Sequence, residues 1–570
     1  MKVYLNQVGF YPEDDKRAVF DHDAKEYDVV DEKGNSVFHG SVSHFGTDEI
    51  SGDDTYTADF SALKTEGKYR IKSGDVISSA FTVSSNVYDK LMKDICKCFY
   101  YLRCGDALDK EYAGVYYHEP CHMTKAAIYN PDFDPGDEKD MIDVSGGWHD
   151  AGDFGRYSTA GAVALAHLLY GIRFFDNLLD VEFDIPKVKC ERNDRNQSSG
   201  KDATLPDILA EAKVELDFLL KMQREDGGVW HKVTTQYHAP FQMPEDDHGQ
   251  LFLYNVSSMA TADMAAICAL AYTVYVNYDK IYADRLLAAA HRSYEWLNNN
   301  QDSVLFSNPA NSGTGDYTEA EDISNRYWAA ASMYETTGDK KYLEDASKYK
   351  AELEDFDKKA KNSGNHGYIS AKAGCLVGMG WAEVGGLGSL SLLLKKEDNE
   401  LTSDIRKAFC EEADRLCKSA AKNGFMLCMD KDDFIWGSNM ELLKYLMILT
   451  VTDKTDPDPK YKPVIRAGID YLLGCNSMDT SYVTGNGDKA YKHPHLRPTA
   501  TDGIDEPWPG LVSGGPNRGL QDERASKLPK DLPPMKCYLD HEDCYSLNEI
   551  TIYWNSPLVF VLAGIMNGGR

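Results

Sequence analysis

The sequence AFTVSSNVYDKLMKDICKCFYYL, residues 80–102, changes its hydrophobic pattern halfway along. Its first four residues are strand formers, whereas the apolar positions after about residue 85 follow the i, i+3, i+4 spacing of an amphipathic helix. Those positions are Tyr88, Leu91, Met92, Ile95, Phe99 and Leu102. We therefore predict a β-rich domain over residues 1–84 and a helical domain over residues 85–570.

The N-terminal part carries about seven short runs of strand-forming residues, such as Arg17–Phe20 and Tyr56–Phe60. Turn signals such as Glu32-Lys33-Gly34-Asn35 separate these runs. Many short strands joined by frequent turns predict a β-sandwich. No residue pattern in this part indicates catalysis, so we expect a domain that supports its neighbour.

The remainder of the chain contains about twelve helix candidates. Several, for example residues 262–275, are apolar nearly all round and are expected to be packed on most sides. An Asp-Lys pair followed by a Tyr recurs at Asp279–Tyr282, at Asp339–Tyr342 and, with an insertion, at Asp453–Tyr461. Such repeats predict helix hairpins that bury their faces against one another. Periodicity alone leaves a closed barrel of six hairpins and an open solenoid as alternatives.

The charge balance limits the classes of partner. The chain of 570 residues has 91 acidic and 61 basic side chains, and its formal net charge is −30. Such a surface repels phosphate backbones and anionic lipids, which argues against nucleic acid and membranes as partners. No run of 18 apolar residues is present to span a membrane. A neutral polysaccharide is indifferent to this charge.

The number of cysteines indicates the redox state of the cellular compartment. The 13 cysteines are an odd number without the spacing of a small disulfide framework, which favours free thiols and a reducing environment. The sequence enters a strand pattern at Met1-Lys2-Val3-Tyr4 without a signal-peptide pattern. We therefore expect a cytoplasmic protein, with a secreted protein whose leader has been removed as the alternative. The oligomeric state is not predicted.

The stretch Gly146-Gly147-Trp148-His149-Asp150-Ala151-Gly152-Asp153 places two carboxylates three residues apart. Only small residues separate them, so a ligand can approach both closely. Carboxylates handle protons, and an aromatic side chain offers an apolar face to a sugar ring. This combination suits chemistry on a sugar, although Gly and Asp are also common in ordinary turns.

A third carboxylate, Glu549, lies in the aromatic and apolar run of residues 543–557. Apolar surroundings disfavour a carboxylate anion, so they are expected to raise the pKa of this side chain. A carboxyl group with a raised pKa suits a general acid near neutral pH. One acid and one ionised carboxylate are the working parts of a glycosidase.

Together these segments resemble glycoside hydrolase family 9, the family of many inverting cellulases. The resemblance rests on GGW-x-DAGD at residues 146–153 and NE-x-x-x-x-WN at residues 548–555. Residues 492–498 are similar to the family's PHHR block, with Leu496 in place of its second His. The N-terminal residues 5–12 are similar to the start of the immunoglobulin-like domain that precedes many of these catalytic domains.

The resemblance implies a fold and an activity. It implies an immunoglobulin-like β-sandwich followed by an (α/α)6 barrel that cleaves β-1,4-glucosidic bonds of cellulose or cello-oligosaccharides. Carried over residue by residue, Asp153 is the general base, Asp150 helps to hold the attacking water, and Glu549 is the general acid. Inversion further implies that base and acid are separated by roughly 6.5–9.5 Å.

The same resemblance implies sugar contacts. His495 and Arg497 match a sugar-contacting pair, and Trp554 matches an aromatic residue of the subsite where the cleaved sugar lies. Weaker predictions for stacking platforms are Trp328, Tyr545, Trp148 and Trp381, because tryptophans at helical spacing more often belong to the core.

Two metals are also predicted. Some family members carry a structural zinc at matching positions, which here are Cys104, Cys121, His122 and His149. Two thiolates and two imidazoles suit tetrahedral zinc without an open coordination position. Calcium is a weaker prediction near residues 313–317, where Glu319, Glu321 and Asp322 are the nearby carboxylates and Ser324-Asn325 replaces an expected acidic pair.

Several alternatives stay open at this point. The expected activity is that of an endoglucanase, with an exo-acting cellodextrinase or an exo-β-glucosaminidase of the same family as the alternatives. Outside it, one alternative is a carbohydrate-binding protein that has lost activity, which the intact Asp150, Asp153 and Glu549 argue against. Another is a zinc hydrolase that uses a metal-bound water beside His149, which requires an open coordination position.

Overall fold

The computed structural model describes residues 1–132, 141–190, 203–363 and 373–568. It divides into two compact units, one formed by residues 1–98 with 413–570 and the other by residues 99–412. No helix in these described ranges is long and apolar enough to cross a membrane.

The N-terminal residues form a β-sandwich. Its strands are β1 (Val3–Tyr4), β2 (Gly9–Phe10), β3 (Arg17–Phe20), β4 (Glu26–Asp31), β5 (Ser36–Thr47), β6 (Asp54–Asp59), β7 (Gly67–Ser73), β8 (Val76–Ile77) and β9 (Phe81–Val83). They are ordered β1-β3-β6-β5-β4-β7-β9-β2, with β8 on β7. The long strand β5 pairs with β4 through its first half and with β6 through its second half. It thereby connects two layers that enclose a core including Phe20, Val29, Phe60 and Phe81.

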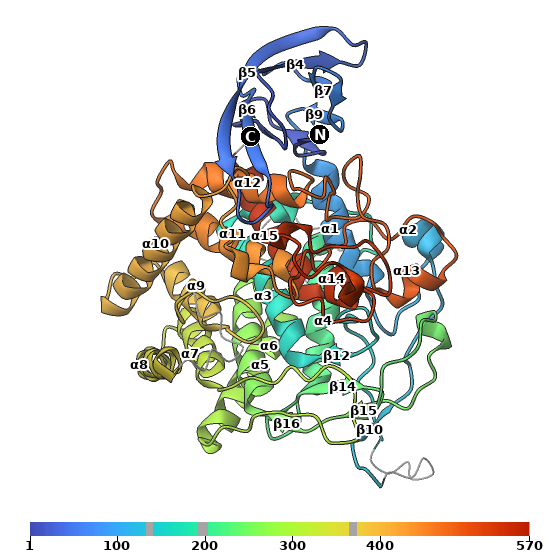
Figure 1. Ribbon diagram of the computed structural model, residues 1–570. Coiled ribbons are helices and arrows are strands. Elements are labelled where there is room, and N and C mark those ends of the chain that lie inside the picture. The colour runs from blue at the N-terminus through green and yellow to red at the C-terminus, as the bar shows by residue number, and fades with distance from the viewer. Residues whose placement is uncertain (133–140, 191–202, 364–372, 569–570) are drawn as a thin grey trace. The chain divides into compact units, whose positions relative to one another are not determined.

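Two kinds of helix alternate along the rest of the chain (Figure 1). Six described helices are buried along most of their length: α3 (Ser158–Phe174), α5 (Ser258–Tyr275), α7 (Ile323–Thr337), α9 (Gly385–Lys395), α11 (Ser438–Thr455) and α15 (Ile552–Gly568). Six amphipathic helices alternate with them: α1 (Asp89–Tyr101), α4 (Asp207–Met222), α6 (Lys280–Asn299), α8 (Lys340–Ser363), α10 (Glu400–Ala420) and α12 (Tyr461–Leu472).

The packing within the unit of residues 99–412 follows this alternation. Helix α3 packs on α5, α5 on α7 and α7 on α9, while α4, α6 and α8 each cover the buried helix that precedes them. An inner and an outer row of helices is the arrangement expected of helical hairpins in an (α/α)6 barrel. The predicted fold class, a β-rich domain followed by a helical domain, is confirmed.

Short strands and helices lie within the loops that connect the long helices. In residues 99–412 these include β10 (Ala126–Ile128), β11 (Met141–Ile142), β12 (Arg156–Tyr157), β14 (Lys232–Thr234) and β15 (Phe252–Leu253). They form one sheet, in which Tyr157 of β12 lies opposite Lys232 of β14. In residues 413–570 the short helices α13 (Arg497–Thr501) and α14 (Tyr545–Asn548) flank two of the predicted motifs.

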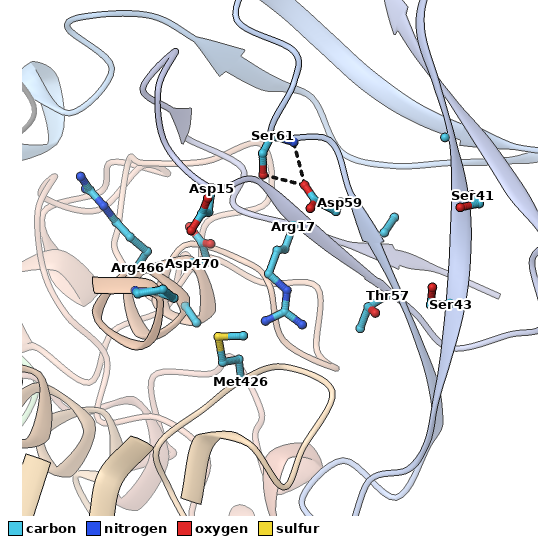
Figure 2. A pocket seen from close by; sticks show the side chains of 14 residues that line it. Asp15, Arg17, Ser41, Ser43, Thr57, Asp59, Ser61, Met426, Arg466 and Asp470 are labelled. Atoms are coloured by element: carbon cyan, nitrogen blue, oxygen red, sulfur yellow. Dashed lines mark hydrogen bonds between the residues drawn. The ribbon is translucent and has the colours of Figure 1, made fainter. Parts of the chain in front are cut away.

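A cavity of about 520 Å³ lies in the unit formed by residues 1–98 and 413–570. Residues of β3, β5, β6 and α12 line it, including Arg17, Ser43, Thr57 and Arg466. Figure 2 shows these polar side chains together with Asp59, which accepts hydrogen bonds from Ser61. None of the predicted site residues belongs to this lining.

Candidate active site and metal centre

The carboxylate pair lies on a tight turn before α3. Gly147 has a φ of +81°, and a Cβ atom there would lie 2.7 Å from the ring of Phe218. The N–H of Asp150 donates to the carbonyl of Gly155 at 3.0 Å, and the N–H of Gly155 donates to Asp153 Oδ2 at 3.0 Å. A Cβ atom on Gly155 would lie only 2.7 Å from that carboxylate oxygen. The glycines are therefore required for the close approach of chain and carboxylates.

Asp150 is almost completely buried, and its partner comes from a distant loop. Its Oδ2 accepts a hydrogen bond from the hydroxyl of Tyr317. Its other oxygen, Oδ1, is buried without a hydrogen-bond partner among the described residues. Burial raises the pKa of Asp150 well above its ordinary value; the bond from Tyr317 acts in the opposite direction, and the charge of Asp153 adds to the rise. The structure thus places at this turn a carboxyl group with one oxygen that is available to accept or donate a hydrogen bond.

Asp153 has two further neighbours with polar side chains. Nδ1 of His238 lies 3.2 Å from Asp153 Oδ2, and the Tyr157 hydroxyl donates to the same oxygen at 3.4 Å. Sequence reasoning missed His238, which lies in a loop with no local motif. It also missed the contact of Tyr317, although the surrounding Gly-Thr-Gly-Asp-Tyr block at residues 313–317 was visible as a signal.

The predicted acid and the residues predicted to contact the sugar beside it belong to the unit that contains residues 413–570. There Glu549 follows α14 directly, and a parallel β-bridge joins it to His495. The N–H of His495 donates to the carbonyl of Asn548 at 2.9 Å, and the N–H of Gly514 donates to the carbonyl of Glu549 at 2.8 Å. Arg497 begins α13, two residues beyond His495. The structure therefore brings the predicted acid and the predicted sugar-contacting pair onto neighbouring backbone segments.

Aromatic side chains near this segment differ in accessibility. Tyr545 is 38% exposed, and its ring centroid lies 5.8 Å from that of His495 and 5.4 Å from that of Trp436. Trp436 is itself 40% exposed and was not predicted from the sequence. Trp554 is buried and lies against Gly437 and Gly514, where an added Cβ would approach its ring to 3.0 and 2.9 Å.

Two of the proposed stacking platforms lie in the core instead. Trp328 of α7 is completely buried, and its indole N–H donates to the hydroxyl of Tyr170 at 3.1 Å. Trp148 is also buried, and its indole N–H donates to Glu211 at 2.9 Å. A buried ring bonded through its N–H offers no surface to a sugar, which corrects the predictions for Trp328 and Trp148. Trp381 packs edge-on against Tyr317 at 5.0 Å.

The four predicted metal ligands form one buried cluster. Ligand atoms of Cys104, Cys121, His122 and His149 lie within 4.8 Å of one another. Nδ1 of His122 is 3.3 Å from Nε2 of His149, and Sγ of Cys121 is 3.9 Å from the same Nε2. Tetrahedral zinc with Zn–N distances of 2.0 Å separates two nitrogens by about 3.3 Å. The donor set and its spacing therefore fit a closed tetrahedral metal site.

The surroundings of the cluster fit the same assignment. Nε2 of His122 lies 3.2 Å from Asp247 Oδ2, the carboxylate–imidazole contact that orients a metal-bound histidine. The N–H of Cys104 donates to the carbonyl of Gly147 at 2.7 Å. Since His149 directly precedes Asp150, a metal here would fix the turn that presents the carboxylate pair.

Two of the three carboxylates suggested as calcium ligands, Glu321 and Asp322, make hydrogen bonds or ion pairs within the protein. Glu321 accepts hydrogen bonds from the N–H and the hydroxyl of Ser324 at 2.9 and 2.7 Å. Asp322 pairs with Arg326 at 2.9 Å. Burial raises the pKa of Glu319 well above its ordinary value. Oxygens of Glu321 and Asp322 that already take part in these contacts are less available to calcium.

The sandwich, the helical domain and the carboxylate turn together define a two-domain glycoside hydrolase. The family model of glycosyl hydrolase family 9 matches residues 88–562, and that of the cellulase N-terminal Ig-like domain matches residues 1–78. The chain belongs to glycosyl hydrolase family 9, as its motifs predicted.

Relatives and solved structures agree with this assignment. The chain is 63% identical to a cellodextrinase of Butyrivibrio fibrisolvens, over 99% of this chain and 100% of the relative. It is similar to AaCel9A in complex with a cellobiose-like isofagomine, with a TM-score of 0.86 and 32% identity, over 99% of this chain and 100% of that one. It is also similar to a Zn-binding triple mutant of the family 9 endoglucanase J30, with a TM-score of 0.84 and 30% identity, over 98% and 100% of the two chains.

Proposed function

We propose that this enzyme hydrolyses β-1,4-glucosidic bonds of cello-oligosaccharides with inversion at the anomeric carbon. The observation that carries the proposal is the carboxylate turn, where both aspartates bond to Gly155 and Asp150 Oδ1 is buried without a hydrogen-bond partner among the described residues. Two adjacent carboxyl groups can grip one water molecule and take a proton from it.

The proposed reaction uses three carboxyl groups. Asp150 holds a water molecule. Asp153 accepts a proton from this water as the water oxygen bonds to the anomeric carbon. Glu549 donates a proton to the glycosidic oxygen as the bond between that oxygen and the anomeric carbon breaks. Water is thereby added across the bond; after each turnover Asp153 releases its proton to solvent and Glu549 takes one up from solvent.

Residues beside Glu549 are proposed to bind the sugar. His495 and Arg497 can donate hydrogen bonds to ring hydroxyls. Tyr545 offers an exposed aromatic ring for stacking, and Trp436 extends that surface. Trp554 is buried against Gly437 and Gly514, so the sugar contact predicted for it is limited to the small part of the side chain that stays accessible.

We propose zinc as the ion of the Cys104, Cys121, His122 and His149 cluster. Two thiolates and two imidazoles prefer zinc to calcium or magnesium. When bound, zinc supplies structural cross-linking of the loops. Four protein ligands leave no open position for a metal-bound water, which argues against the alternative of a zinc hydrolase.

Soluble oligosaccharides are the favoured substrate because the relative that is 63% identical is named a cellodextrinase. Hydrolysis of internal bonds in longer glucans is the second possibility, since a structural relative is an endoglucanase.

The test is the time course of products from cellohexaose and from carboxymethyl cellulose, with Glu549→Gln as the control. An exo-acting oligosaccharide enzyme releases glucose or cellobiose early and leaves the viscosity of carboxymethyl cellulose unchanged. Mid-length products and a rapid fall in viscosity would indicate an endoglucanase. No turnover of either substrate by the wild type would overturn the β-glucan assignment and direct attention to amino sugars.

A further inference from the structure

Lys232 is a buried cation beside the proposed catalytic turn. It opens β14, opposite Tyr157 of β12, and its side chain is not exposed to solvent. Burial lowers the pKa of Lys232 to about 7, while the charges of Asp316 and Asp153 act in the opposite direction. Burying an ammonium group is costly, so a lysine retained here needs partners that compensate for its lost hydration.

Three neutral oxygens of one loop receive the amine. Lys232 Nζ lies 2.6 Å from Asn308 Oδ1, 2.9 Å from Thr314 Oγ1 and 2.6 Å from the carbonyl of Gly315. The three contacts match the three donors of an ammonium group. Aromatic rings surround it further out, with the centroid of Tyr254 at 4.5 Å, Phe306 at 5.4 Å and Tyr157 at 5.7 Å.

The loop that Lys232 holds carries Tyr317, whose backbone is strained. Tyr317 has a φ of +49°, the left-handed region that an aromatic residue rarely adopts. Such a conformation persists only where the surroundings over-determine it. The carbonyl bonded by Lys232 belongs to Gly315, two residues before Tyr317, and the Tyr317 hydroxyl donates to Asp150.

We propose that Lys232 is a positioning residue that holds the 308–317 loop so that Tyr317 keeps Asp150 in place. The inference rests on the proposed role of Asp150 in holding water. A role in stability alone would be served better by an apolar side chain of similar volume, because the three groups that contact the buried amine are neutral and repay little of its lost hydration.

The test is a double-mutant cycle in the full chain, with Lys232→Met, Tyr317→Phe and the combined variant assayed on cellohexaose at about pH 6, below the pKa of Lys232. Each single variant is expected to lose about 100-fold in kcat with KM changed less than about twofold, since small misplacements of a reacting group have effects of that size. The combined variant is expected to lose no more than the single ones. Lys213→Met, which removes a lysine packed over the Tyr282 ring at 4.1 Å, is the matched control and keeps its kcat.

Multiplied losses in the combined variant, or an unchanged kcat in Lys232→Met, would overturn the inference. If Lys232→Met does not fold, Thr314→Val removes one of the three acceptors at nearly constant shape and takes its place in the cycle. Asp150→Asn separates the two proposals: full activity in that variant contradicts the role of Asp150 itself. An inactive Asp150→Asn together with multiplied losses contradicts only the role of Lys232.

Discussion

At the scale of single residues, the carboxylate turn depends on partners that come from distant segments. Asp150 is bonded by Tyr317, 167 residues further along the chain, and Asp153 is contacted by His238, 85 residues further along. A carboxylate that must take a proton and release it again needs a fixed orientation. Tyr317 and His238 supply that orientation from two different loops.

Replacement of His238 by Asn tests one of these partners. The side chain of His238 is 41% exposed, so we expect the thermal midpoint to stay unchanged. The kcat on cellohexaose is expected to fall about tenfold because the contact to Asp153 Oδ2 is lost. His44→Asn removes an exposed His–Asp pair of the sandwich at 2.7 Å and serves as the control. Equal kcat values for His238→Asn and the wild type would show that the pair has no part in the reaction.

Single residues also differ in whether their role could be predicted from the sequence. The carboxylates could be proposed from the sequence because short local motifs surround them, and the four residues of the Cys/His cluster because the family pattern marks their positions. Trp328 could not be judged correctly, because a tryptophan on a helix has the same spacing whether it faces a cleft or the core. Lys232 and His238 carry no local signal at all, since their contacts exist only after folding.

At the scale of elements, the cluster of Cys104, Cys121, His122 and His149 connects the segment that follows α1 to the carboxylate turn. A closed metal site contributes to folding, so its loss is expected to lower stability before it affects chemistry. The turn is expected to loosen as a consequence, and activity to fall with it.

Metal analysis of purified protein tests this site. We expect about one zinc per chain in the wild type and almost none in Cys121→Ser, whose thermal midpoint falls by several degrees. Cys417→Ser changes a partly exposed thiol elsewhere and is expected to keep both the zinc and the midpoint. A wild-type protein that holds no zinc after expression with zinc would contradict the assignment.

Helix α12 contributes a second prediction at this scale, on pH dependence. Asp470 accepts a hydrogen bond from Asn6 at 2.8 Å, and burial raises its pKa from 3.8 to about 7. The folded chain therefore binds more protons than the unfolded chain between these pKa values. The free energy of unfolding is highest while Asp470 is protonated, and this stabilisation is lost as the pH rises through about 7.

Asp470→Asn cannot ionise and still offers an oxygen to Asn6. Thermal unfolding measured from about pH 5 to about pH 8 is expected to show a flatter midpoint profile for this variant than for the wild type. The exposed Asp505→Asn serves as the control and is expected to follow the wild-type profile. Parallel profiles for Asp470→Asn and the wild type would contradict the argument.

At the scale of the whole molecule, the change of hydrophobic pattern near residue 85 was enough to predict a strand-rich part and a helical part. Strand β9 ends at Val83 and α1 begins at Asp89. Helices buried along most of their length, such as α5, were visible as segments that are apolar nearly all round. The arrangement of the hairpins was not visible, because periodicity describes one helix at a time and gives no information on which helices become neighbours.

In the proposed reaction, base and acid act from opposite faces of the sugar and invert the anomeric carbon. The direct test is the configuration of the sugar newly released from cellohexaose, followed by proton NMR during the first minutes before mutarotation. The account predicts that the new reducing end appears first as the α-anomer, which then equilibrates. Initial release of the β-anomer would contradict it, because retention requires a covalent intermediate and carboxyl groups only about 5–5.5 Å apart.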